Sequence, residues 1–396
     1  MLGLDRGDEL TDSEIAEGHL PLRLPEATVK DHNRAVQLRR NALGNGLQPP
    51  NWLAASIDLS DLLYQQLIVM LASLEEFEGV FNKLAEDIVQ ECALPSRTLE
   101  WFRKSLYHNT VGGKCNRGRS VVDTVSILLD RPLSSTEFFE TATLGWMVEL
   151  FQAFMLVTDD IMDASKTRRG KPCWYLIKDV GMIAINDAVM IESGIYILLK
   201  KHFRQHPAYL SMMELFHEVS YKTEVGQSCD LITAPPDANI ETFTLEQYLF
   251  IVIHKTAYYT FDLPIALALM YTQRATPHNL QVVRDLSLVM GEYFQVQDDF
   301  LDAYADPEIL GKIGTDIIDK KCSWLVLQAM DRCTPDQMTI LKENYGVNDP
   351  ECEATVKALY RQIDLEKVFS EYEETKVNQL EQMIGEIDPA EGLRKE

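Results

Sequence analysis

Two short aspartate clusters are the residues whose type and spacing best suit metal chemistry. Both follow the spacing Asp-Asp-x-x-Asp, at Asp159, Asp160 and Asp163 and again at Asp298, Asp299 and Asp302. At 100° per residue, the first and last aspartate of each cluster lie one above the other on one helix face. Such like charges destabilise a helix unless solvent or a cation compensates them. Carboxylates suit Mg²⁺ or Mn²⁺, which proteins commonly share with substrate phosphates.

A single cluster of this kind could equally be a solvated acidic helix end. Two clusters on different helices could instead hold one diphosphate from both sides through bridging ions. They would then withdraw charge from the diphosphate as it departs. The pair therefore predicts a site that ionises a C–O bond.

Two basic stretches stand out in a chain whose formal net charge is -24. Residues 112–119 combine glycines with Lys114 and Arg117, so that backbone amides and cations could approach an anion together. Residues 166–171 follow the first aspartate cluster and contain Arg168 and Arg169. Each stretch could also be an ordinary solvated turn.

Composition limits the partners and the compartment. The acidic net charge argues against nucleic acid as a partner, because binding the phosphate backbone of a nucleic acid needs clustered Lys and Arg. The seven cysteines are scattered without a Cys-x-x-Cys pair, and the eight histidines show no metal-ligand spacing, which favours reduced thiols in an intracellular protein. Apolar runs fall short of the roughly 20 residues that span a membrane, so we expect a soluble protein without stable membrane insertion.

The elements that must position these residues are predicted to be helices. From about residue 56 onward, apolar residues recur at three- and four-residue spacing, and alternating strand-like runs are absent. We therefore predict an all-α fold, a single large bundle of long helices. Residues 1–50 read as an N-terminal extension, followed by one domain over residues 51–396. We expect a cytoplasmic protein; the alternative is mitochondrial targeting through the extension, although its many acids disfavour that role.

A longer set of motifs carries a family resemblance. The chain resembles the farnesyl diphosphate synthases of the eukaryotic kind, within the class I trans-prenyltransferases. The matching landmarks, in order, are Gly-Gly-Lys-x-Asn-Arg-Gly at 112–118, Gln152, the first aspartate cluster with Arg168, Arg169 and Gly170, then Gly226-Gln227-x-x-Asp230, Lys255-Thr256, Phe294-Gln295 with the second cluster, and residues 311–316 through Lys321. The resemblance implies an isoprenoid synthase-like bundle around a central diphosphate-binding cavity, and a homodimer.

The resemblance also implies how two diphosphates would be held. Asp159, Asp163 and Asp302 would be leading ligands of about three Mg²⁺ ions on an allylic diphosphate, with Asp160, Asp298 and Asp299 close by. Arg168, Lys255 and Lys312 would complete the contacts to the allylic diphosphate, and Lys114, Arg117 and Arg169, with Gln152 nearby, would hold isopentenyl diphosphate. Bidentate arginine suits that second task. The further substrate contacts expected are Thr256, Gln295 and Lys321.

The implied reaction is a condensation through an allylic carbocation. The groups expected to take part in catalysis are Lys255, Thr256, Gln295 and Lys312. Dimethylallyl and then geranyl diphosphate would ionise, and isopentenyl diphosphate would attack the cation. The departing diphosphate would then take the proton, because no His or Glu in these motifs is an obvious base.

Chain length is expected to depend on Phe154 and Met155. Met155 precedes Asp159 by four residues, so it lies on the same helix face about 6 Å deeper, where a growing tail would point. Relatives that make farnesyl diphosphate commonly have two aromatic residues there, and methionine is more adaptable. The sequence thus leaves geranyl diphosphate or another chain length open as the product. A non-enzymatic regulatory subunit is a further alternative, although both aspartate clusters are intact.

Overall fold

The computed structural model describes residues 73–235, 238–305, 314–388 and 393. The extension over residues 1–50, with its targeting alternative, and Lys312 lie outside the described residues. The predicted all-α class is confirmed. The helices are α3 (Leu74–Val89), α4 (Ser96–Thr110), α5 (Asn116–Leu129), α6 (Ser135–Met162), α7 (Ile183–Phe203), α8 (Tyr209–Thr233), α9 (Leu245–Ile251), the π-helix η3 (Val252–Asp262), α10 (Leu263–Tyr271), α11 (Pro277–Tyr304), α13 (Trp324–Arg332), α14 (Pro335–Asn344), α15 (Pro350–Gln362) and α16 (Leu365–Gly385).

One small hairpin interrupts the helices, and it is the only sheet within the described ranges. Its strands β1 (Thr167–Arg168) and β2 (Lys171–Pro172) pair antiparallel, with Arg168 opposite Lys171. Short 3₁₀ helices η1 (Trp174–Leu176) and η2 (Ile240–Thr242) complete the elements. The periodicity of the sequence did not predict this hairpin.

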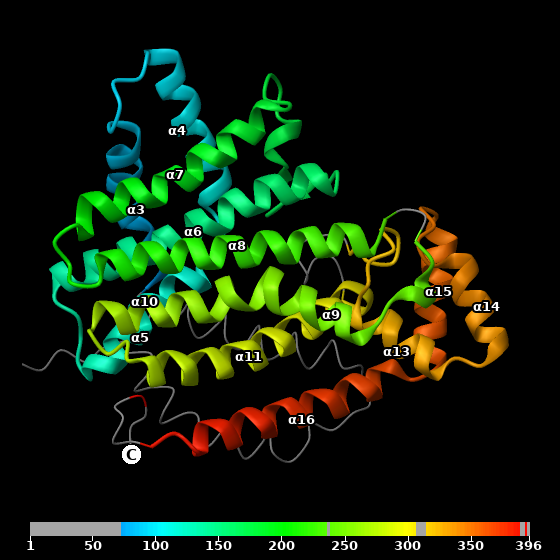
Figure 1. Cartoon of the computed structure of the whole chain (residues 1–396). Coiled ribbons are helices and arrows are strands. Elements are labelled where there is room, and N and C mark those ends of the chain that lie inside the picture. The colour runs from blue at the N-terminus through cyan, green and yellow to red at the C-terminus, as the bar shows by residue number, and fades with distance from the viewer. Residues whose placement is uncertain (1–72, 236–237, 306–313, 389–392, 394–396) are drawn as a thin grey trace, which may run out of the picture. The chain divides into compact units, whose positions relative to one another are not determined.

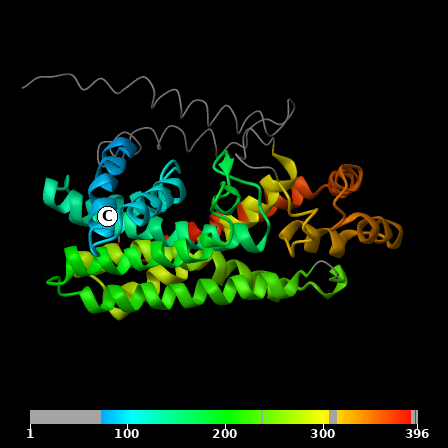
Figure 2. The same ribbon diagram turned by 90° about the horizontal axis from the view of Figure 1, so that it is seen from above.

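The long helices pack as a bundle. The helices α8, α10 and α11 run roughly side by side, α14 and α15 lie at one end, and α3 and α4 lie at the other (Figure 1). Seen from above, α8 lies on one face and the N-terminal helices lie on the opposite face (Figure 2). The central helix α6 packs on α5 and α7, whereas η3 packs between α8 and α11.

The helices α6 and α11 carry the two aspartate clusters at their C-terminal ends. Helix α6 begins with a capping box in which Ser134 and Glu137 satisfy each other's backbone amides. Helix α11 is capped by Thr276, whose side chain accepts from Asn279 N–H, and it begins at Pro277. By length and composition α6 alone among the described helices could cross a membrane, but 78% of its apolar window is buried inside the protein, as in a core helix.

The apolar core has two parts. The larger cluster joins α3 to α8 with η3 and α10, and it includes Trp146 and Phe151 of α6. The smaller cluster joins α9, α11 and α13 to α16 around Trp324 and Tyr360. Helix α6 therefore belongs to the larger core, and the C-terminal half of α11 belongs to the smaller one. Each core thus holds one of the two helices that end in an aspartate cluster.

The π-helix η3 depends on two glycines. A Cβ at Gly226 of α8 would lie 2.2 Å from Lys255 N, and a Cβ at Gly291 of α11 would lie 2.2 Å from the Ala257 Cβ. Only glycine therefore permits the close approach of both neighbouring helices to this wider turn. The π geometry presents Lys255 and Thr256 in the middle of the bundle, and π-turns of this kind are frequent at functional sites.

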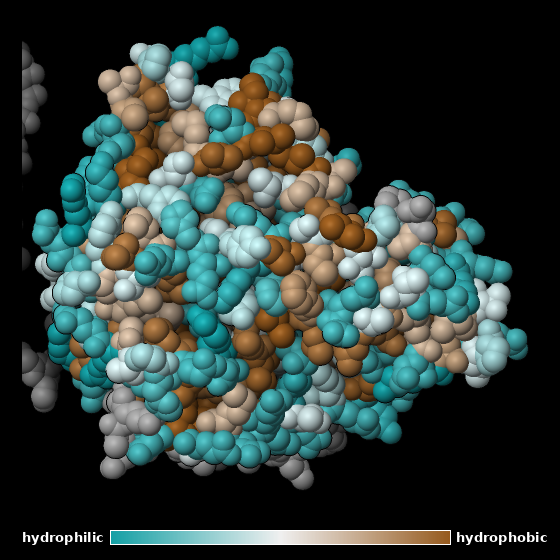
Figure 3. All heavy atoms as spheres, viewed as in Figure 1, coloured by the Kyte–Doolittle hydropathy of each residue, from teal (hydrophilic) through white to brown (hydrophobic). Residues whose placement is uncertain are grey.

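Exposed apolar side chains gather at the start of α7. Met182, Ile183, Ile185 and Val189 are each at least half exposed. Hydrophobic surface accordingly lies over α7 on the face shown in Figure 3. Leu210, Tyr221 and Ile232 on α8 are also exposed.

Candidate active site

The first aspartate cluster faces cationic and amide groups from several elements. Asp159 accepts a hydrogen bond from Gln227 Nε2 at 3.0 Å and lies 3.3 Å from Lys255 Nζ. Asp160 is buried and lies 2.6 Å from Arg168 Nη2. Asp163 lies 3.1 Å from Lys321 Nζ. The structure therefore brings side chains from separate motifs to the first cluster: Gln227, Lys255, Arg168 and Lys321.

Asp230 joins two of these lysines. It is 7% exposed, and its Oδ2 accepts from Lys255 Nζ at 2.8 Å and from Lys321 Nζ at 3.1 Å. Burial acts to raise the pKa of Asp230, but the two ammonium groups outweigh it and the pKa is lowered. Likewise, burial lowers the pKa of Lys255, whereas Asp159 and Asp230 raise it above its usual value. Asp230 and Lys255 therefore both stay charged at neutral pH.

The second cluster is held by the segment that follows α11. Asp302 is buried and accepts from Thr315 N–H at 3.3 Å and from Asp316 N–H at 3.1 Å. Lys321, which bonds Asp163, comes from the same segment, so residues 314–324 contact both clusters. Asp298 precedes Asp302 by one helical turn and is partly exposed.

Asp299 lies where α11 meets the start of α13. It is 5% exposed, and its two oxygens accept from Gln295 Nε2 at 3.0 Å and Trp324 N–H at 2.8 Å. Burial raises its pKa to about 6, although these hydrogen bonds act to lower it. Asp299 thus ties α11 to the start of α13.

Gln295 extends this contact to the π-helix. Its Oε1 accepts from Thr256 Oγ1 at 3.1 Å while its Nε2 donates to Asp299. Two of the groups expected to take part in catalysis therefore bond each other. The orientation of the Gln295 amide is fixed by one donor and one acceptor.

The basic stretches meet around the glycine loop. Arg169 Nη1 donates to Asn109 O at 3.1 Å and Thr110 O at 3.2 Å, at the end of α4. Its guanidinium would lie 3.1 Å from a Cβ at Gly113, so it packs directly on the loop. The structure therefore brings the two basic stretches, residues 112–119 and 166–171, into contact.

Arg117 reaches from α5 to η3. Its Nε donates to Thr260 Oγ1 at 3.0 Å, and its guanidinium lies 4.8 Å from the Tyr259 ring centroid. Lys114 is exposed at the loop, and Gln152 is partly buried on α6. Arg117 of the predicted second diphosphate site thus contacts η3, and Gln152 of the same predicted site lies on α6.

Glu149 is a buried acid that sequence reasoning missed. Its Oε1 accepts from Gly118 N–H at 2.8 Å, which fixes the first turn of α5 on α6. Burial raises the pKa of Glu149. A Glu three residues before Gln152 inside an apolar helix was the available signal.

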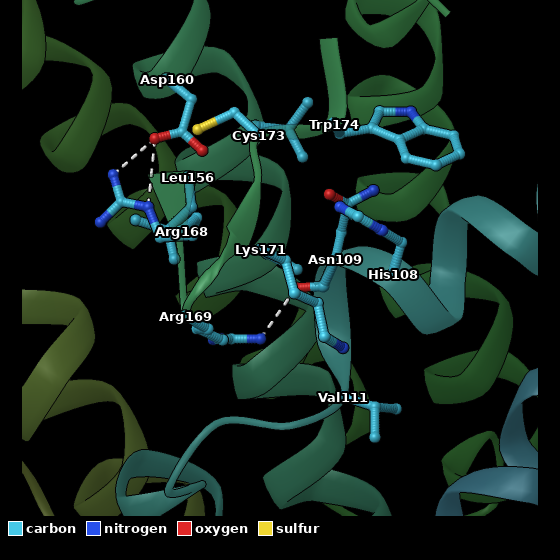
Figure 4. A pocket seen from close by; sticks show the side chains of 12 residues that line it. His108, Asn109, Val111, Leu156, Asp160, Arg168, Arg169, Lys171, Cys173 and Trp174 are labelled. Atoms are coloured by element: carbon cyan, nitrogen blue, oxygen red, sulfur yellow. Dashed lines mark hydrogen bonds and ion pairs between the residues drawn. The ribbon is translucent and has the colours of Figure 1, made fainter. Parts of the chain in front are cut away.

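A small pocket lies behind the hairpin (Figure 4). Asp160 and Arg168 face each other at one side of it, and Arg169 points toward Asn109 below them (Figure 4). Leu156 and Val157 of α6 supply part of its apolar wall. The hairpin therefore covers an apolar face of α6 while presenting both arginines.

The predicted chain-length residues pack against the core. Phe154 is buried and meets Phe151 edge to face, with ring centroids 5.1 Å apart, and Met155 is partly buried beside the same cluster. Phe151 stacks on Tyr259 of η3. An aromatic group thus lies one turn before the first aspartate cluster.

The donor atoms of both clusters are carboxylate oxygens, which fit a hard divalent cation. Over the described ranges, no group of three or more His, Cys, Asp or Glu is arranged to hold a metal ion directly. Instead, lysine and arginine side chains neutralise the first cluster. Asp159, Asp163 and Asp302 remain the residues whose chemistry suits the cation, supported by the neighbouring cationic groups that suit a diphosphate.

Comparison with known proteins agrees with this site. The model of the polyprenyl synthetase family matches residues 99–363. The chain is 51% identical to the farnesyl pyrophosphate synthase of Schizosaccharomyces pombe, over 81% of this chain and 93% of that protein, and 46% identical to that of Saccharomyces cerevisiae, over 81% and 93%.

A solved structure agrees as well. The farnesyl diphosphate synthase of T. brucei complexed with risedronate superposes with a TM-score of 0.74 at 35% identity, covering 81% of this chain and 95% of that one. The matched region contains both aspartate clusters, both basic stretches and η3. The chain belongs to the polyprenyl synthetase family.

Proposed function

We propose that this chain is a farnesyl diphosphate synthase that condenses isopentenyl diphosphate with dimethylallyl and then geranyl diphosphate, releasing diphosphate at each step. The observation that carries the proposal is that Lys255 and Lys321 contact the first aspartate cluster, while the segment that carries Lys321 also binds Asp302 of the second cluster. This chain spans more than nine-tenths of the length of relatives named farnesyl pyrophosphate synthase.

The allylic diphosphate would lie between the two clusters. Asp159, Asp163 and Asp302 would hold Mg²⁺ there, and the bound cations would stabilise the negative charge on the departing diphosphate. Arg168, Lys255 and Lys321 add fixed positive charge at the same place. Because the charge on the leaving group grows in the transition state, these side chains accelerate ionisation rather than only binding substrate.

The chain's own oxygens would then face the carbocation. Thr256 and Gln295 hold each other by a hydrogen bond, so their dipoles are oriented before the substrate ionises. The apolar residues around Phe154 exclude water from the tail of the substrate. Excluding water favours attack by isopentenyl diphosphate over hydrolysis.

Isopentenyl diphosphate would bind at the glycine loop through Lys114, Arg117 and Arg169. We predict that Arg169→Gln raises the KM for isopentenyl diphosphate by about tenfold to a hundredfold, the worth of one or two charge-assisted hydrogen bonds. The KM for geranyl diphosphate should change less than threefold, because Arg169 lies at the loop rather than at the aspartates. Steady-state kinetics with each substrate varied in turn measures both values.

Lys178→Gln is the matched control, because Lys178 is exposed in the same connection between α6 and α7. It should leave both KM values unchanged. An equal rise of the two KM values in Arg169→Gln, or no rise in either, would contradict the separate second site.

We also propose that two copies associate through α7 and α8. The exposed side chains of Ile185 and Val189 lie about one turn apart on α7. They therefore form an apolar patch, whereas single exposed apolar side chains need no partner. We predict a mass in light scattering of about twice the chain mass of 45.1 kDa, and dissociation in Ile185→Asp.

Val347→Asp is the control for this substitution, since Val347 is exposed in the connection between α14 and α15. It should leave the mass unchanged. A monomeric mass for the unsubstituted chain at micromolar concentration would argue against this assembly.

A further inference from the structure

Asp187 is a buried acid to which the proposed reaction gives no role. It lies on α7, is 1% exposed, and accepts hydrogen bonds from two indoles. Trp101 Nε1 lies 3.0 Å from both carboxylate oxygens, and Trp174 Nε1 lies 2.8 Å from Oδ2. No lysine, arginine or histidine of the described part of the chain forms an ion pair with it. A carboxylate buried between neutral donors is unfavourable for stability, which indicates that its position serves another purpose.

The two indoles come from the two segments that hold Arg169. Trp101 lies on α4, whose last turn supplies the Asn109 and Thr110 carbonyls that accept from Arg169. Trp174 opens η1, two residues after β2 ends. Asp187 therefore joins α4 and the hairpin to a third element, α7. We call these three residues the Trp101–Asp187–Trp174 tie.

The hairpin cannot fix its own orientation. It has only two residue pairs, and its turn places Arg169 and Gly170 at φ 52° and 71°. A two-stranded ribbon of this size is not stable alone. The Trp174 ring packs on His108, with centroids 5.0 Å apart, and His108 Nε2 lies 3.1 Å from Pro172 O. Trp174 is therefore the anchor that sets where the hairpin lies (Figure 4).

We infer that Asp187 is a positioning residue for the condensation: through Trp174 it fixes the hairpin so that Arg168 meets Asp160 and Arg169 packs on the glycine loop. This inference rests on the role proposed above for Arg169. Asp187 touches no reacting group. It acts by limiting the positions that both arginines can adopt before substrate arrives.

Two substitutions, each removing one donor to the Asp187 carboxylate, test the inference. Trp174→Phe and Trp101→Phe each remove one indole donor, but only the first loosens the hairpin, because α4 is also packed on α3, α6 and α7. We expect Trp174→Phe to raise the KM for isopentenyl diphosphate about tenfold, as for one lost charge-assisted contact, and Trp101→Phe to raise it less than threefold. Melting temperatures of both variants show how far each one loses stability.

A rescue separates positioning from stability. In Asp187→Asn the carboxamide nitrogen replaces one of the two oxygens that Trp101 contacts, so a donor faces a donor. The expected result is a rise of about tenfold in the KM for isopentenyl diphosphate. In Asp187→Asn/Trp101→Phe the opposing donor is gone and the carboxamide oxygen still accepts from Trp174, so the KM should return to within threefold of the unsubstituted value.

The outcomes distinguish the inference from the proposed site. If Arg169→Gln leaves the KM for isopentenyl diphosphate unchanged, the proposed role of Arg169 fails. If Arg169→Gln raises it while Trp174→Phe and Asp187→Asn lower only the melting temperature, Asp187 is merely structural and the inference is overturned. If Asp187→Asn does not fold, Trp174→Phe and the double variant decide: a raised KM in the former with a near-normal value in the latter supports the inference, and any other result overturns it.

Discussion

Asp159→Ala and Asp302→Ala are each expected to lower kcat by about a hundredfold to a thousandfold, the scale at which removing one preorganised electrostatic group slows a reaction. Each removes a carboxylate that the proposed function assigns to the cation on the leaving diphosphate. Lys255 would also lose its partner at 3.3 Å in Asp159→Ala, so its ammonium group would turn further toward Asp230.

The fold should survive both substitutions. Asp302 accepts two backbone N–H groups, so its removal is expected to lower the free energy of unfolding by about 1–3 kcal/mol. That loss is tolerable for a chain with two large apolar cores. Circular dichroism and thermal melts would show whether the variants remain folded while turnover is measured.

Asp285→Ala is the matched control, because Asp285 is an exposed aspartate on the same helix as Asp302. It should leave kcat within about twofold, as surface substitutions generally do. A folded Asp159→Ala or Asp302→Ala variant with near-normal turnover would contradict the role of both clusters.

The helical positions of the two clusters could be predicted from spacing alone. The 3.6-residue period placed Asp159 and Asp163 on one face at the end of a helix, and the structure confirms that helix as α6. The same holds for Asp298 and Asp302 on α11. Such inferences are local, because they depend only on residues within two turns of each other.

Contacts between distant segments could be predicted only in part. Asp230 was part of a recognised motif but had no assigned role, and Lys321 was expected only as a substrate contact. The hydrogen bond between them joins residues 91 positions apart in the sequence. No periodicity carries information on that separation, and only the packing of α8 against the 314–324 segment reveals it.

The orientation of Asp299 shows a second limit. It follows Asp298 by 100° around α11, so it cannot face the same way, and the neighbouring α13 supplies its partner Trp324 N–H. The π-helix was also missed, since its wider turn is set by Gly226 and Gly291 on other helices. Asp187 was missed because a single acid in an apolar helix has no motif.

The condensation itself is the most direct test of the account, and it combines metal removal with product analysis. The isolated chain, incubated with labelled isopentenyl diphosphate, dimethylallyl diphosphate and Mg²⁺, is expected to form farnesyl diphosphate, C15, as its main product. EDTA should reduce incorporation by at least about a thousandfold, because the aspartate clusters would then lack the cation that their oxygens suit. Excess Mg²⁺ should restore the rate.

Chromatography of the products after phosphatase treatment measures both rate and chain length. Accumulation of C15 that depends on Mg²⁺ is the result that the account predicts. Geranyl diphosphate or chains longer than C15 as the main product would contradict the assigned chain length at Phe154 and Met155. No incorporation by the folded, isolated chain in the presence of Mg²⁺ would contradict the enzymatic function itself and favour a regulatory subunit.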